Sequence, residues 1–401
     1  METAVPRLAY VLNRFPTASQ GFVYNQMAAP VEAGWNTMVL ARRLEPREPT
    51  PEVIRRTGYR ERCVFLDRTS TLINWWLRLL RRPLTCTLLR RDLQRQTARQ
   101  TGRSGGLGDA HFDLLHAQFG TTGAMAEALR RAGVVTGPLV TAFRGYDLTA
   151  HVRKMGVGYY RRLFQNGDWF LPSCHYFVPR LKEIGCPPER LQVIYSGIDT
   201  ARFERTAQER CSPAAGDPVR VVMIGRLVPK KGTATGLKAV AEVKRRGAAV
   251  HLTLIGDGPE AAPLRALAEA LGIAENVTFA GSQTAEKIPA ILARSDVFLQ
   301  PSETPASGDQ DGAANAPKEA GAAGLPTIVT AHGGLPEVVQ DGVTGFVVPE
   351  GDVAALAARL SELCRQAELR HRLGERARAF VKATFDNRVI NAQVMACYRE
   401  L

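Results

Sequence analysis

Long apolar runs are missing from this 401-residue chain. No uninterrupted apolar segment reaches the roughly 20 residues that a helix needs to span a bilayer. The first residues, METAVPRLAYVLNRFPTASQ, also lack a basic stretch followed by an apolar one, so they give no sign of a secretory signal. These two absences argue against an integral membrane protein, and we expect a cytoplasmic one.

Paired cysteines are missing as well. The seven cysteines are scattered, odd in number and never spaced as C-x-x-C. A disulfide framework or a structural zinc site would need such pairs, so we expect reduced thiols and no zinc. The cysteines are Cys63, Cys86, Cys174, Cys186, Cys211, Cys364 and Cys397.

Acidic residues are too few to balance the basic ones. Lysine and arginine number 52 against 39 aspartates and glutamates, which gives a net charge of +13. This charge predicts an anionic partner: nucleic acid, a membrane surface or a phosphorylated small molecule. No aromatic ladder or nucleic-acid-binding module accompanies it, so nucleic acid is the least favoured of the three.

The basic residues concentrate in residues 75–103, where arginines alternate with tryptophans and leucines. One interpretation is a basic amphipathic helix that lies on an anionic membrane. The other is a pair of surface helices that pack their apolar faces on the core. Pro83 interrupts the segment and favours the second interpretation. Peripheral contact with the inner face of the membrane therefore stays a hypothesis.

The composition is that of a folded protein, with 45% hydrophobic and 23% charged residues. Short apolar runs alternate with helical stretches in both halves of the chain, which is typical of parallel sheets covered on both faces. Two such series predict an α/β protein with two Rossmann-like domains. The expected strands are residues 8–12, 37–41, 112–117, 138–143, 168–172 and 191–195, then 219–224, 250–255, 276–280, 296–300, 326–330 and 344–348.

The boundary between the domains is expected in the polar, Ala-, Gly- and Pro-rich residues 204–218. We therefore predict a first domain over residues 1–200 and a second over residues 201–384. In doubly wound sheets ligands bind at the carboxyl ends of the strands, so the loops after the strands should carry the chemistry. Two such sheets would share one cleft.

The segment VVMIGRLVPKKGT combines a strand end with a glycine and three basic residues. Gly225 lets the backbone turn sharply, Arg226 offers a planar fork for phosphate oxygens, and Lys231 adds a mobile positive charge. Together they predict a diphosphate site that works without a metal. The alternative is a basic loop that only solvates a strand end.

The segment SETPASGDQDGAANAPKEAGAAGLP places small residues beside spaced carboxylates. Asp311 follows a strand, and Glu319 lies eight residues on, in the expected first turn of a helix. Helix N-termini bind anions, and Glu319 could accept hydrogen bonds from two ribose hydroxyls. The alternative for Glu319 is a favourable charge in a first helical turn. His332, before two glycines that we expect to approach the ligand, is interpreted as incidental.

The order of the segments GRLVPKKG, IGDGPE, VTFAGS, DVFLQPS, DGAANAPKEAGAAGLP and AHGGLPEVVQDGVTGFVV resembles that of the retaining glycosyltransferases of family four. Upstream, HAQFGTTG, TAFRGYDLTA and VIYSGIDTARF extend the likeness to nearly the whole chain. Residues 13–27 look like the opening of family members that build bacterial exopolysaccharides. Each motif is modest alone, but six in the same order are specific.

This resemblance implies the GT-B fold, in which two Rossmann-like domains face each other across a cleft. It places a nucleotide sugar in the C-terminal domain and the acceptor in the N-terminal one, with retention of anomeric configuration. No metal and no cofactor beyond the substrate are expected. The last segment, residues 385–401, resembles the terminal helix that crosses back to the first domain.

The resemblance also assigns roles in the donor site. Arg226 and Lys231 match the diphosphate-binding pair, which would stabilise the negative charge of the leaving group. Glu319 matches the second glutamate of the family's paired acids, which holds the ribose. Asp311 stands where the first of them contacts the donor sugar, but the family has glutamate there. Further donor contacts are expected from Gly225, Gly281, Ser282, Gly312, Ala313, Ala314 and Asn315.

Two departures lie in the N-terminal half. Arg144 stands where the family has a histidine close to the reaction centre, and Gln118 replaces a second histidine. Arg144 stays protonated and cannot act as a base, but it could bind a phosphate or an acidic substituent. The alternative is a tolerated substitution on a cleft loop. The residues expected at the acceptor or cleft are Gln20, Gly21, His116, Gln118, Tyr146 and Asp147.

The predicted function is therefore transfer of a sugar from a nucleoside diphosphate to a hydroxyl of a saccharide, a lipid-linked saccharide or a natural product. UDP is the preferred nucleotide. No protein nucleophile stands out, which favours attack from the leaving-group side. Three alternatives remain open: a non-catalytic relative that binds nucleotide sugar, a nucleotide-sugar epimerase of the same fold and, least favoured, a basic nucleic-acid-binding protein.

Overall fold

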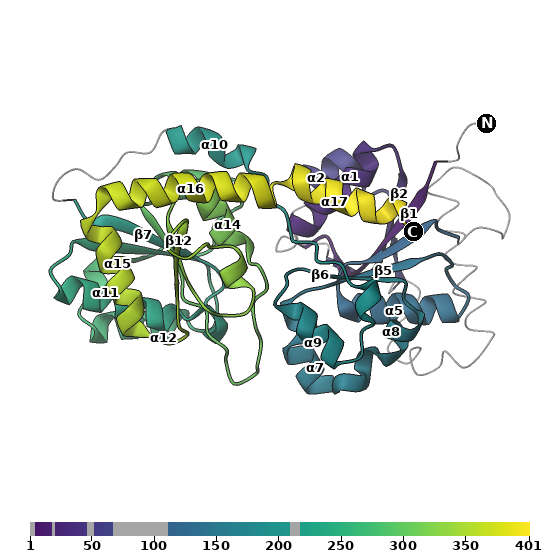
Figure 1. The fold of residues 1–401 in the computed structure, drawn as a ribbon, viewed down its shortest axis with the longest axis horizontal. Coiled ribbons are helices and arrows are strands. Elements are labelled where there is room, and N and C mark those ends of the chain that lie inside the picture. Colours follow the sequence, from purple (N-terminus) through teal and green to yellow (C-terminus); the bar gives the residue numbers. More distant parts are fainter. Residues whose placement is uncertain (1–4, 18–20, 46–51, 67–110, 209–216) are drawn as a thin grey trace. The chain divides into compact units, whose positions relative to one another are not determined.

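The computed structural model describes residues 5–17, 21–45, 52–66, 111–208 and 217–401. Gln20 and the basic residues 75–103 lie outside these ranges. The chain forms two compact units, shown in Figure 1. Unit 1 comprises Met1–Ser173, Phe177–Ser196 and Ile390–Leu401, and unit 2 comprises Cys174–Tyr176 and Gly197–Val389. No helix in the described ranges is both long and apolar enough to cross a membrane.

Unit 1 is built on a six-stranded parallel sheet with the order β3-β2-β1-β4-β5-β6. The order reverses between β1 and β4, and ligands bind beside such a switch point in doubly wound sheets. Figure 1 shows α1, α2 and α17 on one side of this sheet and α5 and α8 on the other. The strands are β1 (Arg7–Phe15), β2 (Asn36–Leu44), β3 (Cys63–Phe65), β4 (Leu114–Ala117), β5 (Leu139–Phe143) and β6 (Trp169–Pro172).

The helices of unit 1 lie in the crossovers between its parallel strands or follow the last strand, β6. They are α1 (Gly21–Glu32), α2 (Glu52–Thr57), α5 (Gly120–Arg131), α6 (Gly145–Leu148), α7 (Ala150–Met155), α8 (Arg161–Asn166) and α9 (Phe177–Glu183), with the short 3-10 turns η3 (Val157–Tyr160) and η4 (Pro188–Arg190). The last helix of the chain, α17 (Asn387–Arg399), also packs here.

One strand predicted for unit 1 was wrong, and one strand was not predicted. Residues 191–195 form no strand: Leu191 makes an isolated bridge to Phe170, and Gln192 N–H donates to the Phe170 carbonyl at 3.1 Å. The segment runs beside β6 but makes too few hydrogen bonds with it to add a strand to the sheet. The short edge strand β3 was not predicted, because a three-residue run carries no periodicity.

Helix α17 contributes to the core of unit 1. Its buried side chains Ile390, Val394 and Tyr398 follow the four-residue spacing of one helix face. They join the cluster that contains Leu8 and Tyr10 of β1. Full burial of one such aliphatic side chain contributes about 1.5–3 kcal/mol, so the end of the chain is a substantial part of this core.

Unit 2 has a second six-stranded parallel sheet, with the order β12-β11-β10-β7-β8-β9 and its switch point between β7 and β10. The predicted α/β class with two Rossmann-like sheets is thus confirmed. Its strands are β7 (Val219–Ile224), β8 (Val250–Ile255), β9 (Val277–Phe279), β10 (Val297–Gln300), β11 (Thr327–Thr330) and β12 (Gly345–Val348).

The helices of unit 2 cover both faces of this sheet, as its continuous apolar strands require. They are α10 (Ala201–Gln208), α11 (Thr233–Arg245), α12 (Ala261–Ala270), α13 (Ile288–Ala293), α14 (Asn315–Ala322), α15 (Val353–Arg365) and α16 (Ala367–Phe385), with the 3-10 turns η5 (Pro229–Lys231), η6 (Ala274–Asn276) and η7 (Leu335–Glu337).

Candidate active site

The loop after β7 lies at the switch point of unit 2. Gly225 N–H donates to the Ile255 carbonyl at 2.9 Å, and a Cβ on Gly225 would lie 3.4 Å from Cε of Lys231, whose side chain covers it. Gly232 adopts a φ of +58°, and a Cβ there would lie 1.7 Å from the Pro301 carbonyl oxygen. Only glycine fits this approach. The basic turn is therefore fixed against the loop that follows β10.

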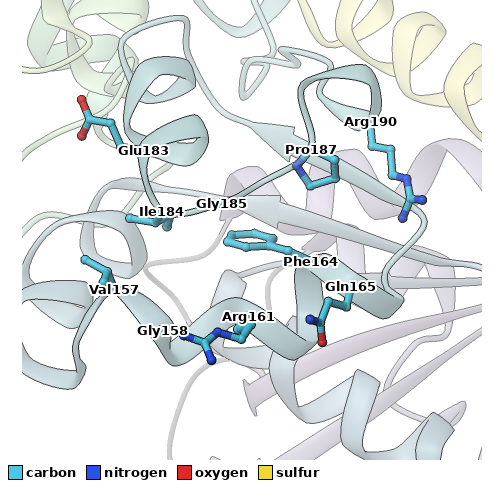
Figure 2. A pocket seen from close by; sticks show the side chains of 10 residues that line it. All are labelled: Val157, Gly158, Arg161, Phe164, Gln165, Glu183, Ile184, Gly185, Pro187 and Arg190. Atoms are coloured by element: carbon cyan, nitrogen blue, oxygen red, sulfur yellow. The ribbon is translucent and has the colours of Figure 1, made fainter.

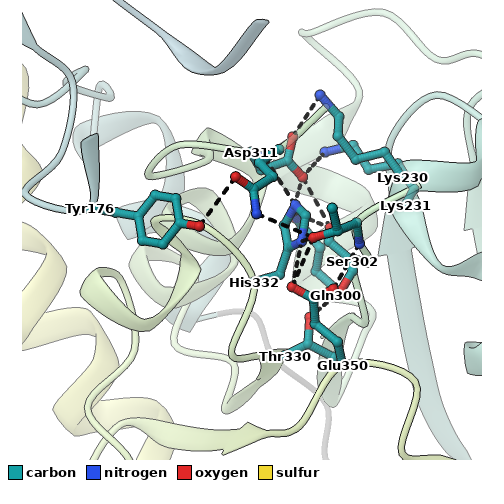
Figure 3. Close-up of polar contacts among 11 residues, drawn as sticks. Tyr176, Lys230, Lys231, Gln300, Ser302, Asp311, Thr330, His332 and Glu350 are labelled. Atoms are coloured by element: carbon teal, nitrogen blue, oxygen red, sulfur yellow. Dashed lines mark hydrogen bonds and ion pairs between the residues drawn. The ribbon is translucent and has the colours of Figure 1, made fainter. Parts of the chain in front are cut away.

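Asp311 receives both lysines of that turn, as Figure 3 shows. Nζ of Lys231 lies 2.8 Å from Oδ2 of Asp311, and Nζ of Lys230 lies 3.3 Å from Oδ1. Lys230 also pairs with Oδ2 of Asp309 at 2.7 Å. The hydroxyl of Ser302 donates to Oδ2 of Asp311 at 3.0 Å. The structure thus brings the two predicted donor residues Lys231 and Asp311 into direct contact.

The carboxylate of Asp311 is buried but ionised. Burial alone would raise its pKa, but the ammonium groups of Lys231 and Lys230 outweigh the loss of water and hold the pKa well below its usual range. Each lysine is itself largely shielded from solvent. The result is a compact set of charges in which cations and carboxylates balance one another.

The backbone of Asp311 is held by the loop after β11. Its N–H donates to Nε2 of the fully buried His332 at 3.0 Å. Nδ1 therefore carries the ring proton and donates to Oε1 of Glu350 at 2.9 Å. Gly334 N–H donates to the Asp311 carbonyl at 3.0 Å, and a Cβ on Gly333 would lie 2.0 Å from that oxygen.

The interpretation of His332 as incidental was therefore wrong. His332 and Gly333 position the Asp311 loop, whereas the sequence led us to expect these glycines beside a ligand. The signal in the sequence was a histidine and two glycines directly after a strand, at the edge where ligands bind.

Helix α14 begins at Asn315, after Ala314, and no side chain caps its first turn. Glu319 is the fifth helical residue and thus lies in the second turn, so its expected place in the first turn was wrong. Glu319 is partly buried, and desolvation raises its pKa against the opposing charges of Arg202 and Lys318. Gly312, like Ala314 and Asn315, is partly exposed beside this helix start, and Ala313 is buried.

The remaining donor-site candidates of unit 2 lie on the same edge of the sheet. The side chain of Arg226 is exposed directly after β7. Gly281 follows β9, has a φ of +66° and accepts a hydrogen bond from Gly256 N–H at 2.9 Å. Ser282 beside it is exposed. Among the described residues, no group of three or more His, Cys, Asp or Glu is placed to hold a metal ion.

In unit 1, Arg144 follows β5 at the carboxyl edge. Its Nε and Nη2 donate to the carbonyl and the side-chain oxygen of Gln118 at 3.2 and 3.0 Å, and its Nη1 donates to Oγ of Ser196 at 2.7 Å. The ring of Phe22 stacks against it at 4.6 Å. These bonds use three of the five guanidinium N–H groups. Burial lowers the pKa of Arg144 to about 10, so it remains charged at neutral pH.

Two other candidates of unit 1, Asp147 and His116, are buried and make hydrogen bonds that join elements of the fold. Asp147 is buried and accepts hydrogen bonds from the N–H groups of Gly120 at 2.6 Å and Arg144 at 3.0 Å. It therefore joins the start of α5 to the loop after β5, and desolvation raises its pKa to about 7. His116 is fully buried and bonds through Nδ1 to the hydroxyl of Tyr398. Burial lowers the pKa of His116 to about 3, so it is neutral.

Three further candidates lie on the same edge of unit 1. Gln118 is fully buried, and its Nε2 has no hydrogen-bond partner in the part of the chain that the structure describes. Tyr146, directly after Arg144 and Gly145, is exposed. Gly21 begins α1 and is partly exposed. The structure thus joins Arg144 to Gln118 and places His116 in the core.

Comparison with known proteins covers nearly the whole chain. Residues 22–202 match the family model described as Glycosyltransferase Family 4, and residues 204–380 match the model described as Glycosyl transferases group 1. The putative colanic acid biosynthesis glycosyltransferase WcaL of Salmonella typhimurium is 31% identical over an alignment of 402 positions, which covers 97% of this chain and 98% of WcaL. The chain belongs to glycosyltransferase family four.

Two more relatives of this glycosyltransferase are informative. The amylovoran biosynthesis glycosyltransferase AmsK of Erwinia amylovora is 34% identical over 252 residues, 63% of this chain and 61% of AmsK. The crystal structure of Anabaena HepE in complex with UDP has a TM-score of 0.74 and 18% identity, and covers 99% of this chain and 100% of HepE. The predicted GT-B fold class is thereby confirmed.

Our interpretation of the sequence of this glycosyltransferase missed several residues that contact Asp311 or its neighbours. Lys230 was read as part of a basic turn but not as a partner of two carboxylates. No role was given to Ser302, which bonds to the side chain of Asp311, or to His332, which bonds to its backbone. Glu350, which fixes the tautomer of His332, was given no role either.

Proposed function

We propose that this glycosyltransferase transfers a hexosyl group from a nucleoside diphosphate sugar to a hydroxyl group, with retention of anomeric configuration. The observation that carries the proposal is the pair Lys230 and Lys231 at the switch point of unit 2, with Arg226 exposed on the same edge. Arg226 offers its charge directly, and the two lysines become available to a diphosphate as it displaces them from Asp309 and Asp311.

The donor site follows from these positions. Arg226 and Lys231 bind the diphosphate oxygens, and the backbone at the start of α14 adds N–H groups. Glu319 accepts hydrogen bonds from the ribose hydroxyls. UDP is the favoured nucleotide, because HepE, which shares the fold, was crystallised with UDP. Asp311 already neutralises Lys231, so a bound diphosphate must share this lysine with the carboxylate or displace it.

We favour a front-face reaction. The acceptor oxygen attacks the anomeric carbon from the side of the leaving group, and the bond from that carbon to the diphosphate oxygen breaks. The acceptor proton passes to the departing phosphate oxygen, and Arg226 and Lys231 stabilise the charge that develops there. Because these side chains supply the positive charge, we expect no metal requirement.

The acceptor is proposed to bind at the carboxyl edge of the unit 1 sheet. A saccharide or lipid-linked saccharide is favoured, because WcaL and AmsK are named for the biosynthesis of the polysaccharides colanic acid and amylovoran. A natural-product acceptor is the alternative. Arg144 has two N–H groups left after its three bonds, and Nε2 of Gln118 adds a third donor, so this pair would suit a carboxylate or a phosphate on the substrate.

The proposed test combines binding with product analysis. Thermal unfolding is followed with UDP, GDP and ADP for the wild type, Lys231→Ala and the exposed control Lys238→Ala. A ligand that binds the native state raises the midpoint, and the proposal expects this rise for one nucleotide, lost in Lys231→Ala and kept in the control. No rise with any nucleotide would contradict the donor site.

The second candidate is a non-catalytic relative that binds nucleotide sugar. It is favoured by Asp311, Arg144 and Gln118, which depart from the family pattern, and by the resting ion pair of Lys231 with Asp311. NMR of the product separates the two: an α-linked product from an α-linked donor supports retention, an inverted product contradicts it, and binding without transfer or donor hydrolysis supports the second candidate. An epimerase would instead release a changed nucleotide sugar without acceptor.

A further inference from the structure

Exposed apolar side chains gather on one surface of unit 1, whereas the residues assigned to the donor site belong to unit 2. Tyr146, Met155, Val157 and Tyr159 expose 56%, 50%, 66% and 36% of their areas, and they are four of the eight large hydrophobic residues classed as exposed in the described ranges. Such a concentration on a folded protein marks an interaction site. We call residues 146–162 the α6–α8 surface.

Aromatic side chains pack beneath this surface. Helix α7 ends at Met155, and Gly156, with a φ of +89°, turns the chain into η3, so that residues 153–159 are all exposed. The ring of His151 lies 5.8 Å from that of Tyr146 and 4.6 Å from that of Tyr159. Tyr160 beneath them is buried against Phe143. The exposed apolar groups therefore stand on a packed base.

Basic residues flank the apolar ones on both sides. Arg153 and Lys154 precede Met155, Arg161 and Arg162 follow Tyr159, and residues 150–166 contain no acid. All four cations are exposed. Exposed apolar side chains flanked by cations are typical of a segment that binds a lipid surface. The apolar groups enter the boundary between headgroups and acyl chains, and the cations contact the lipid phosphates.

A hollow of about 510 Å³ adjoins this surface. Figure 2 shows Phe164 in the middle of its lining, with Arg161 of α8 and Arg190 of η4 on different sides. One carboxylate, Glu183, also lines it. A volume in this range suits a small polar molecule such as a phospholipid headgroup.

We propose that the α6–α8 surface binds an anionic phospholipid bilayer. Met155, Val157 and Tyr159 enter the boundary between headgroups and acyl chains, and Arg161 and Arg162 contact lipid phosphates. This proposal is distinct from the membrane hypothesis for residues 75–103, since it concerns another segment. It needs no donor, so vesicle binding and transfer can fail independently. Tyr146 lies three residues after the end of β5, so the surface begins beside the edge proposed for a lipid-linked acceptor.

Co-sedimentation with vesicles tests the proposal on the full chain. The wild type is compared on phosphatidylcholine vesicles with and without phosphatidylglycerol, and we expect binding only to the second. One lysine or arginine near an anionic surface is worth about fivefold in partitioning, so Arg161→Gln with Arg162→Gln should lower the partition coefficient about 30-fold. The control Arg372→Gln with Arg376→Gln removes the same charge from exposed positions of α16 and should lower it far less.

Insertion is tested separately from charge. Met155→Trp should gain fluorescence quenching by brominated lipids relative to the wild type, and Val157→Ser with Tyr159→Ser should weaken binding. Unchanged thermal midpoints show that each variant is folded. The proposal is overturned if the wild type ignores phosphatidylglycerol vesicles, if the α16 control loses as much as the arginine variant, or if only Trp75→Ser with Trp76→Ser abolishes binding.

Discussion

Asp311→Asn removes one negative charge from between two lysines and should destabilise the unliganded protein. In the native state the carboxylate lies 2.8 Å from Nζ of Lys231 and 3.3 Å from Nζ of Lys230. Asparagine keeps the size of the side chain but leaves Lys231 without a counter-charge. Lys230 keeps its partner Asp309, so the loss is concentrated on Lys231.

The magnitude follows from these distances. At an effective dielectric constant of about 20, each contact represents about 5–6 kcal/mol of attraction, most of which is offset by the loss of hydration. Removal of one partner of a buried pair usually costs about 3–5 kcal/mol, and the surviving Lys230 pair places this case near the lower value, about 3 kcal/mol. For a unit of this size that corresponds to a fall of about 6–12 °C in midpoint.

Thermal unfolding with and without UDP is the assay. UDP carries the diphosphate and the ribose but no hexosyl group, so it supplies negative charge to Lys231 without a contact to the transferred sugar. We expect UDP to raise the midpoint more in Asp311→Asn than in the wild type, because the diphosphate no longer competes with Asp311 for Lys231. Asp309→Asn is the matched control, since it removes a carboxylate from the same loop that pairs with Lys230 but not with Lys231.

The pH dependence gives the sign of the effect independently. The pKa of Asp311 is lowered on folding, so its stabilisation is present above the unfolded pKa of about 3.9 and is lost as pH falls through the lower native pKa. The difference in unfolding midpoint between the wild type and Asp311→Asn should therefore be largest at neutral pH and should shrink below about pH 4. An equal midpoint for both proteins at neutral pH, or a larger UDP response in the wild type, would refute the reasoning.

Three more predictions follow from the same structure. Because desolvation raises the pKa of Glu319, its carboxyl stabilises the fold below the unfolded pKa of about 4.3 and loses this effect as pH rises through the higher native pKa. Glu319→Gln should gain relative stability over that rise in thermal unfolding and weaken nucleotide binding about tenfold in titration, and equal slopes with pH would contradict it. His332→Ala leaves the buried Asp311 N–H without its acceptor and should lower the unfolding free energy in denaturant titrations by about 1–3 kcal/mol, a loss that Thr304→Ala on the neighbouring loop should not match. Arg144→Lys keeps the charge but loses the fork held by Gln118, so KM should rise about tenfold for a carboxylate-bearing acceptor and stay within about twofold for its neutral analogue; equal changes for both would assign Arg144 a structural role.

The two sheets could be predicted because a parallel strand buried on both faces leaves a continuous apolar run, such as VRVVMI. The limits were local: β3 is too short to show a pattern, and residues 191–195 have a strand-like composition but follow β6 through few hydrogen bonds. The start of α14 was misplaced because Ala314 gives no capping signal.

The candidate site was harder to predict, because its contacts join residues far apart in the chain. Lys231 and Asp311 were each assigned to a substrate, but their separation of 80 positions in the sequence hid that they bind each other. The pairing of Arg144 with Gln118 across 26 residues was equally invisible, although both were singled out as departures. The sequence indicates which side chains can bind an anion. Only the packed loops show which carboxylates already pair with those side chains.

The contribution of α17 to unit 1 has a consequence for synthesis of the protein. Tyr398 bonds to His116 in a core that also contains the first strand, so unit 1 is completed by residues translated after all of unit 2. Apart from a three-residue segment, unit 2 is continuous and can fold while it emerges from the ribosome. Unit 1 must wait for the translation of residues 390–401, and until then the apolar sites for Ile390, Val394 and Tyr398 are open. During that interval it is the part of the chain that most needs a chaperone.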